Sequence, residues 1–148
     1  MTQEEKQELL VALCGYLPYG VKLEVKVFDK NLTSVDTIKT MQYDMFGTYV
    51  RLLDDENFSI KPYLRPMSSL TEQEISVVRT LDSNCATIGI LGYDNDSNPQ
   101  WAFGDYRTYT LELLNYLNSI HIDYRGIIDK GLALEAPEEM YEIFPISI

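Results

Sequence analysis

The sequence predicts a single α+β domain spanning residues 1–148. Three observations support this class: an amphipathic helical pattern near the N-terminus, a clean two-residue alternation in residues 21–28, and a second strong helical pattern in residues 108–122. The length suits one domain, and such a chain buries roughly 68–70% of its unfolded surface. The expected order is an N-terminal helix, a small antiparallel sheet, a middle helix, a hairpin and a long C-terminal helix.

The first helix has clear signals at both ends. Thr2 and Glu5 have the spacing of a capping box, in which each side chain accepts the other residue's backbone N–H. Pro18 and Gly20 interrupt the pattern and predict its end. The side chains expected on its buried face lie at helical spacing: Leu9, Leu10, Leu13, Cys14 and Leu17.

A small sheet should follow. Residues 21–28 alternate between apolar and charged side chains, which indicates a half-buried antiparallel strand. A less regular strand is expected within residues 33–43, and a third one in residues 48–53. Consecutive strands with short connections favour a meander or a small SH3-like sheet.

The second half predicts further helices around a hairpin. Residues 58–69 are expected to be extended, because residues that precede proline avoid the α region. Thr71 and Glu74 form a second capping box at the start of the middle helix. Residues 86–93 and 99–106 are predicted to form the hairpin. Asp123 is a candidate N-cap for one or two helical turns after the C-terminal helix.

The charge distribution restricts the classes of partner. The net charge is −11, and residues 67–148 contain four basic and 13 acidic side chains. A surface for nucleic acid or anionic membrane needs clustered lysine and arginine, so we expect neither as a direct partner. No secretory signal or apolar run of membrane-spanning length is present, which favours a cytoplasmic location.

The acidic half leaves one alternative function open, that of a nucleic-acid mimic that inhibits a basic host protein. Such a mimic would bind through carboxylates and lose affinity at high salt. The side chains assigned to this role are Glu135, Glu138, Glu139 and Glu142.

The segment YDNDSNPQWAFGDY, residues 93–106, partly matches a calcium loop. Its candidate ligands at positions 1, 3, 5 and 12 are Asp94, Asp96, Asn98 and Asp105. Position 6 is Pro99, however, where such a loop needs the conformational freedom of glycine. The flanking segments also predict strands rather than helices. We therefore expect a polar hairpin turn, and neither a metal nor a cofactor.

His121 is the single histidine and raises the alternative of an enzyme with a His–carboxylate site. That alternative requires a pocket in which His121, a carboxylate and a tyrosine converge. Asp123 is close in sequence, but residues two apart on a helix point to different faces. The sequence contains no nucleophile elbow and no phosphate-binding loop.

Tyrosine is abundant, with 11 residues, and it suits protein interfaces because a rigid apolar ring carries a polar tip. Two pairs flank the ends of predicted helices, and a charged segment follows the last helix. The candidate protein-binding residues are Tyr16, Tyr19, Tyr106, Tyr109, Asp123, Tyr124 and Arg125. The alternative is that most of these tyrosines line the rim of the core.

Three segments together carry a resemblance: LPYGVK at 17–22, IKPYLRPMSSLTEQE at 60–74 and LNSIHIDYRGIIDKGLALEAP at 117–137. They resemble a family of short, uncharacterised proteins encoded by phages, prophages and mobile elements of gut anaerobes. The resemblance implies no activity. Our preferred expectation is a small non-enzymatic accessory protein of a phage or mobile element that acts by binding another protein.

Overall fold

The computed structural model describes residues 1–28, 34–40, 46–81, 88–93, 95–96 and 99–141. It confirms the α+β class, with a helix first. The α-helices are α1 (Gln3–Tyr16), α2 (Phe46–Leu52), α3 (Glu72–Leu81) and α4 (Leu111–Ser119). The strands are β1 (Lys22–Phe28), β2 (Ser34–Thr40), β3 (Phe58–Leu64), β4 (Ile88–Tyr93), β5 (Pro99–Phe103) and β6 (Leu134–Glu135). Short 3₁₀ turns are η1 (Leu17–Tyr19), η3 (Met67–Ser69) and η4 (Tyr106–Thr108).

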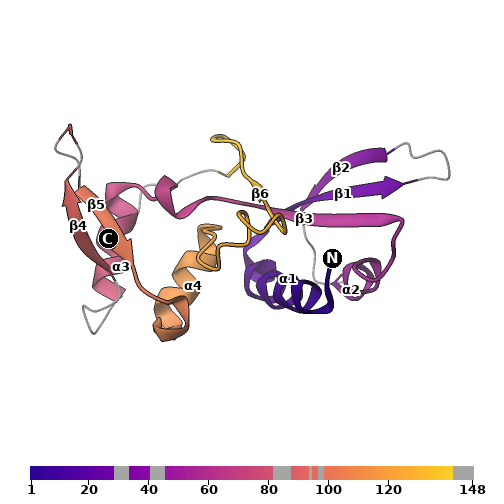
Figure 1. Ribbon diagram of the computed structural model, residues 1–148, viewed down its shortest axis with the longest axis horizontal. Helices are drawn as coiled ribbons and strands as arrows, with labels where there is room; N and C mark the ends of the chain where they lie inside the picture. Colours follow the sequence, from indigo (N-terminus) through magenta and orange to yellow (C-terminus); the bar gives the residue numbers. More distant parts are fainter. Residues whose placement is uncertain (29–33, 41–45, 82–87, 94, 97–98, 142–148) are drawn as a thin grey trace.

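The elements form an elongated arrangement. The sheet of β1, β2 and β3 lies at one end with α1 and α2 on the same side of it, whereas α3 and the β4–β5 hairpin lie at the other end (Figure 1). Helix α4 lies between the two ends. The core forms two clusters, one around α1, β1 and β3 and one between α3 and α4, and Tyr124 packs against both.

Helix α1 begins at the predicted capping box. The Thr2 hydroxyl accepts the Glu5 N–H at 3.1 Å, and the Glu5 carboxylate accepts the Thr2 N–H at 2.9 Å. Its buried residues are Leu9, Ala12, Leu13 and Tyr16, so the buried face is rotated from the predicted one and Cys14 is exposed. The reason is that Ala12 and Tyr16 continue an equally regular helical spacing from Leu9.

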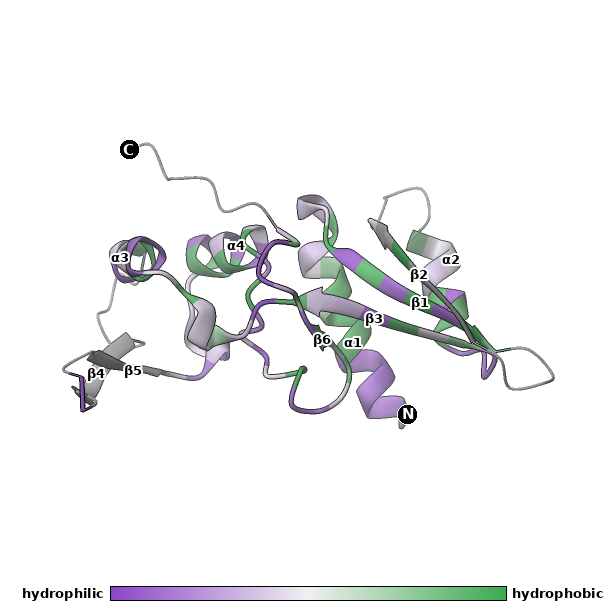
Figure 2. Cartoon of the chain, turned by 90° about the horizontal axis from the view of Figure 1, so that it is seen from above, coloured by the Kyte–Doolittle hydropathy of each residue, from purple (hydrophilic) through white to green (hydrophobic). Residues whose placement is uncertain are grey.

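Strand β1 confirms the alternation in the sequence. Polar and apolar residues alternate along it in Figure 2, and Leu23 and Val25 are buried. The strand order β2-β1-β3-β6 corrects the predicted meander or SH3-like sheet. A meander would place β2 at the centre, whereas here β1 is central and the sheet is open at β2 and β6.

The prediction of a strand in residues 48–53 is wrong, because residues 46–52 form the helix α2. Tyr49 is buried, and Phe46, Leu52 and Leu53 pack against the same cluster at helical spacing. A short apolar run does not distinguish strand from helix by periodicity alone. The third main strand is β3, within the segment predicted only to be extended.

The middle helix and the hairpin are confirmed as α3 and β4–β5, which pair antiparallel. The C-terminal helix is not long: α4 has nine residues, against 14 in α1. It ends because His121 adopts a left-handed backbone, with φ +61°. From Asp123 to Tyr141, the last described residue, there is no helix, and residues 124–131 mostly form turns.

Candidate functional site

The structure brings four side chains together next to the junction of the two core clusters, and we call them the Tyr–Arg cluster: Tyr106, Arg107, Tyr124 and Arg125. The Tyr106 and Tyr124 rings are 5.8 Å apart. The Arg125 guanidinium lies 4.9 Å from the Tyr106 ring centre and 5.7 Å from that of Tyr124. The Arg107 guanidinium lies 5.6 Å from the Tyr106 ring centre. These distances are within the range of cation–π interactions.

Local hydrogen bonds fix the backbone of this cluster. The Asp105 carboxylate accepts the Arg107 N–H at 2.9 Å and so caps η4. The Asp123 carboxylate accepts the N–H groups of Ile127 and Ile128 at 3.0 and 2.9 Å, which holds the loop that carries Tyr124 and Arg125. Burial raises the pKa of Asp123, despite these hydrogen bonds.

The cluster is anchored on one side and open on the other. The Tyr124 hydroxyl donates to the Asn118 side-chain oxygen at 2.8 Å. The Arg107 side chain is 76% exposed, while Tyr106, Tyr124 and Arg125 are half-buried. The Arg125 Nε is buried and has no hydrogen-bond partner among the described residues. The cluster therefore combines rigid rings with guanidinium donors that are not fully used.

The other predicted tyrosines are not part of this surface. Tyr16 is fully buried; its hydroxyl donates to the Ile122 carbonyl, and burial raises its pKa well above the usual value. Its ring lies 6.2 Å from Tyr124, so it supports the cluster from inside. Tyr109 is also buried and donates to the Gly104 carbonyl at 2.9 Å. Tyr19 is partly exposed, and its carbonyl contacts His121.

His121 is packed against neighbouring residues. Its Nε2 lies 2.7 Å from the Tyr19 carbonyl oxygen, and its ring stacks on Tyr141 at 3.8 Å. Burial lowers its pKa, and the charges of Arg65 and Lys22 act in the same direction. Asp123 uses its carboxylate on the loop described above. The convergence required by the enzyme alternative is therefore not found among these residues.

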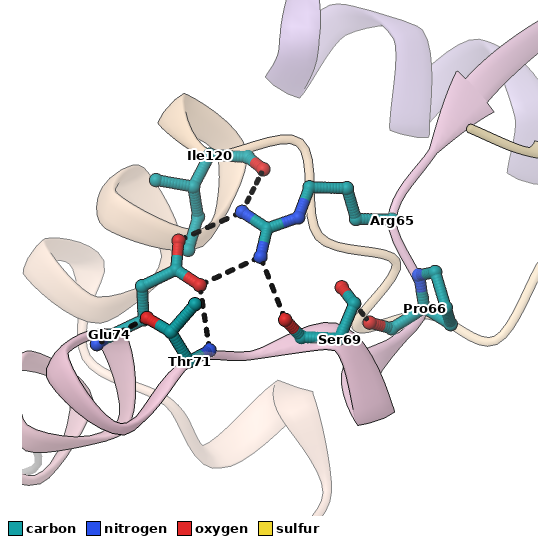
Figure 3. A network of polar contacts seen from close by, with 6 residues as sticks. All are labelled: Arg65, Pro66, Ser69, Thr71, Glu74 and Ile120. Carbon is teal, nitrogen blue, oxygen red and sulfur yellow. Dashed lines mark hydrogen bonds and ion pairs between the residues drawn. The ribbon is translucent and has the colours of Figure 1, made fainter. Parts of the chain in front are cut away.

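A buried ion pair that the sequence did not predict connects three elements (Figure 3). Arg65 donates to both carboxylate oxygens of Glu74, at 2.8 and 2.7 Å, and both side chains are buried. The same guanidinium donates to the Ser69 carbonyl at 3.0 Å and to the Ile120 carbonyl at 3.4 Å. This network joins the end of β3 to the start of α3 and the end of α4.

Glu74 also completes the second capping box, which is confirmed. Its carboxylate accepts the Thr71 N–H at 2.9 Å, and its own N–H donates to the Thr71 hydroxyl at 3.2 Å. Burial alone would raise the pKa of Glu74, but the hydrogen bonds from Arg65 and Thr71 outweigh burial and lower it. Capping-box spacing had identified Glu74, yet nothing in the sequence indicated that Arg65 would share it.

The calcium-loop residues give no metal site in the described part of the chain. Asp96 is exposed, Asp105 caps η4, and Asp94 and Asn98 lie outside the described residues. Within the described ranges, no three His, Cys, Asp or Glu side chains are grouped so that they could hold a metal ion.

Of the residues assigned to the acidic-mimic alternative, Glu135, Glu138 and Glu139 are exposed, whereas Glu142 lies outside the described residues.

Comparisons with protein-family models, curated proteins and solved structures find no match to this chain. Among the helices that the structure describes, none is both long and apolar enough to cross a membrane.

Proposed function

We propose that this protein acts without catalysis, by binding another protein through the Tyr–Arg cluster. The observation that supports this is the convergence of two tyrosines and two arginines on one partly exposed surface. Tyrosine and arginine are enriched among the residues that contribute most to protein–protein affinity. The resemblance of three segments to phage-encoded proteins supports an accessory role in a phage or mobile element.

The geometry favours binding for a specific reason. Arg125 is held against two rings, so little side-chain entropy is lost when a partner contacts it. The Arg107 Nε lies 3.4 Å from the Asp105 carboxylate, but both side chains are exposed, so a carboxylate or carbonyl of the partner can reach the rest of the guanidinium. Because the surrounding chain is strongly acidic, these two guanidinium groups offer a local positive site on a negative molecule.

The test is affinity capture from host lysate with the tagged full-length chain, at about 0.1 M and 1 M salt, where the Debye length falls from about 10 Å to 3 Å. The wild type is compared with a Tyr106→Ala/Arg107→Ala double variant. A matched control is Glu112→Ala, which changes an exposed side chain in the first turn of α4. We expect a partner that the wild type and Glu112→Ala retain and the double variant loses. Retention by the double variant would contradict the proposal.

The acidic mimic remains the second candidate, supported by three exposed glutamates in residues 135–139. It predicts a basic partner that is released at high salt and after substitution of Glu135, Glu138 and Glu139 by glutamine. Binding that persists at 1 M salt would exclude it. The same capture experiment therefore separates the two candidates, since they depend on different residues.

A further inference from the structure

A cavity of about 370 Å³ lies along one edge of β3. Four consecutive residues, Phe58 to Lys61, line it together with α1 and the loop at residues 130–132. Successive strand residues point to opposite faces of a sheet, so four in a row can line one cavity only where it follows the strand's edge. The cavity therefore borders the backbone of β3 as well as its side chains.

The hydrogen-bond register shows which backbone groups face this edge. In an antiparallel pair, alternate residues exchange hydrogen bonds with the partner strand, and those between them point away from it. The Phe28 N–H donates to the Asn57 carbonyl at 2.7 Å, which places Asn57 in bonding position toward β1. By alternation Ser59 and Lys61 also face β1. Ile60 consequently directs its N–H and C=O away from β1.

The other end of the ladder agrees with this register. The Tyr141 hydroxyl accepts the Lys22 N–H at 2.8 Å and donates to the Tyr63 carbonyl at 2.7 Å, so it bridges β1 and β3 at the next bonding position. On the opposite edge, the Leu64 carbonyl accepts the Ala136 N–H at 2.8 Å. Strand β6 pairs only with Tyr63 and Leu64. The β3 edge at Ile60 is therefore unpaired among the described residues.

This unpaired edge is not on open surface, because Ile60 is only 3% exposed. Buried backbone N–H and C=O groups are nearly always hydrogen-bonded, to protein or to water, so water in the cavity or a bound partner must satisfy this pair. An incoming extended peptide supplies both missing groups, as in other cases where a strand is added to a sheet edge.

The two faces of β3 specify the side chains of that peptide. On the face of Ile60, the cavity is closed by the buried Leu9 and Leu132, together with the partly buried Leu53. Lys61 lies on the opposite face, and no ion pair of its ammonium group occurs within the described ranges. A peptide strand next to β3 would place alternate side chains against the apolar face and against Lys61.

We propose that the β3 edge at Ile60 binds an extended peptide of alternating apolar and acidic residues by strand addition. The peptide donates a backbone N–H to the Ile60 carbonyl and accepts the Ile60 N–H. Its apolar side chains enter the cavity beside Leu9 and Leu132, and an acidic side chain pairs with Lys61. This site is separate from the Tyr–Arg cluster and does not depend on it.

The test uses the full chain and the synthetic peptide Ac-Glu-Val-Glu-Val-Glu-NH₂, titrated by NMR with the Ile60 amide as reporter. We expect saturable binding with a Kd below about 1 mM and slower hydrogen exchange of the Ile60 amide. The same peptide with both valine backbone nitrogens methylated should bind at least about tenfold more weakly. In an antiparallel addition, the valine opposite Ile60 carries the N–H that bonds to the Ile60 carbonyl, and methylation removes this donor and adds a clash with the edge. This comparison changes only the peptide, so it carries no risk of unfolding the protein.

A charge-reversal variant tests the face of β3 that carries Lys61. Lys61→Glu should weaken binding of the Glu-Val peptide about three- to tenfold and favour the corresponding Lys-Val peptide. The control Lys6→Glu changes a lysine on α1 that pairs with Asp54 at 3.3 Å and does not line this cavity, so it should leave binding unchanged. The proposal is overturned by an absence of binding up to 1 mM, by equal binding of the methylated peptide, or by an unchanged charge preference in Lys61→Glu.

Discussion

Replacement of Glu74 by alanine should destabilise the protein far more than its position in a first helical turn suggests. Glu74 is 3% exposed and accepts two hydrogen bonds from the Arg65 guanidinium and one from the Thr71 N–H. Alanine removes all three and leaves the guanidinium, itself in a residue only 8% exposed, with two backbone carbonyls as partners.

The expected loss of unfolding free energy is large because breaking a buried ion pair costs much more than the intact pair contributes to stability. Removal of one partner of such a pair costs about 3–5 kcal/mol, because the remaining charge stays buried without compensation. Loss of the capping contact adds to this, by roughly 0.5–2 kcal/mol. A total near the upper end would remove a large fraction of the 5–15 kcal/mol that typically stabilises a domain.

The assay is equilibrium urea unfolding followed by circular dichroism. With a slope of about 2 kcal/mol per molar urea, a loss of 4 kcal/mol lowers the midpoint by about 2 M. The matched control is Glu72→Ala, which removes an exposed carboxylate from the same first turn of α3 and should cost less than about 1 kcal/mol. An Arg65→Met/Glu74→Met double variant should be less destabilised than Glu74→Ala, because it leaves no unpaired charge.

Equal midpoints for Glu74→Ala and Glu72→Ala would refute this reasoning. The pH dependence offers an independent check. Because the pKa of Glu74 is lowered in the folded state, its contribution to the free energy of unfolding is present above its unfolded pKa of about 4.3 and is lost as the pH falls through the folded pKa. Glu74→Gln should therefore flatten the stability profile below about pH 4.5.

Three further predictions concern His121 and the buried tyrosines. Burial lowers the pKa of His121, so the unfolded chain binds a proton at this residue more readily than the folded protein does. The free energy of unfolding should therefore fall as the pH drops from about 6.5, as measured by urea titrations at several pH values. The variant His121→Asn should remove this dependence, since asparagine tolerates the left-handed backbone at this position. Tyr141→Phe should lower the free energy of unfolding by about 1–3 kcal/mol, because it removes the hydroxyl that bonds to Lys22 and Tyr63. Tyr116→Phe should change it by less than about 0.5 kcal/mol, because the buried Tyr116 hydroxyl has no hydrogen-bond partner in the described part of the chain. Equal losses in the two variants would contradict these hydrogen-bond assignments. Burial raises the pKa of Tyr116 and Tyr141 to about 12, so ultraviolet titration should show tyrosines that remain protonated above pH 11, and complete ionisation by pH 11 in the folded protein would contradict this.

The sequence alone identified part of the candidate surface. Tyr106, Tyr124 and Arg125 were identified as binding candidates from tyrosine abundance and local charge, and the fold brings them together. Arg107 was missed, although its position directly after Tyr106 was a usable signal. Tyr16 was included in the same set but is buried, because composition does not reveal which face of α1 packs inward.

The sequence by itself determined features that depend on neighbours along the chain. The capping boxes at Thr2 and Thr71 fix the starts of α1 and α3 through hydrogen bonds three residues apart, and the alternation in β1 follows from the two-residue period of a strand. These signals lie within one or two turns of chain, so they can be recognised without knowing what packs against them.

Only the tertiary structure decided the features that depend on which distant segments meet. The packing of Tyr49 made residues 46–52 a helix, and the pairing of Arg65 with Glu74 depended on the meeting of β3 and α3. Among the described residues, the unpaired edge at Ile60 depended on where β6 stops. In each case a locally ambiguous segment was settled by burial and hydrogen bonding to residues far away in sequence, and such energies are not encoded in any short pattern.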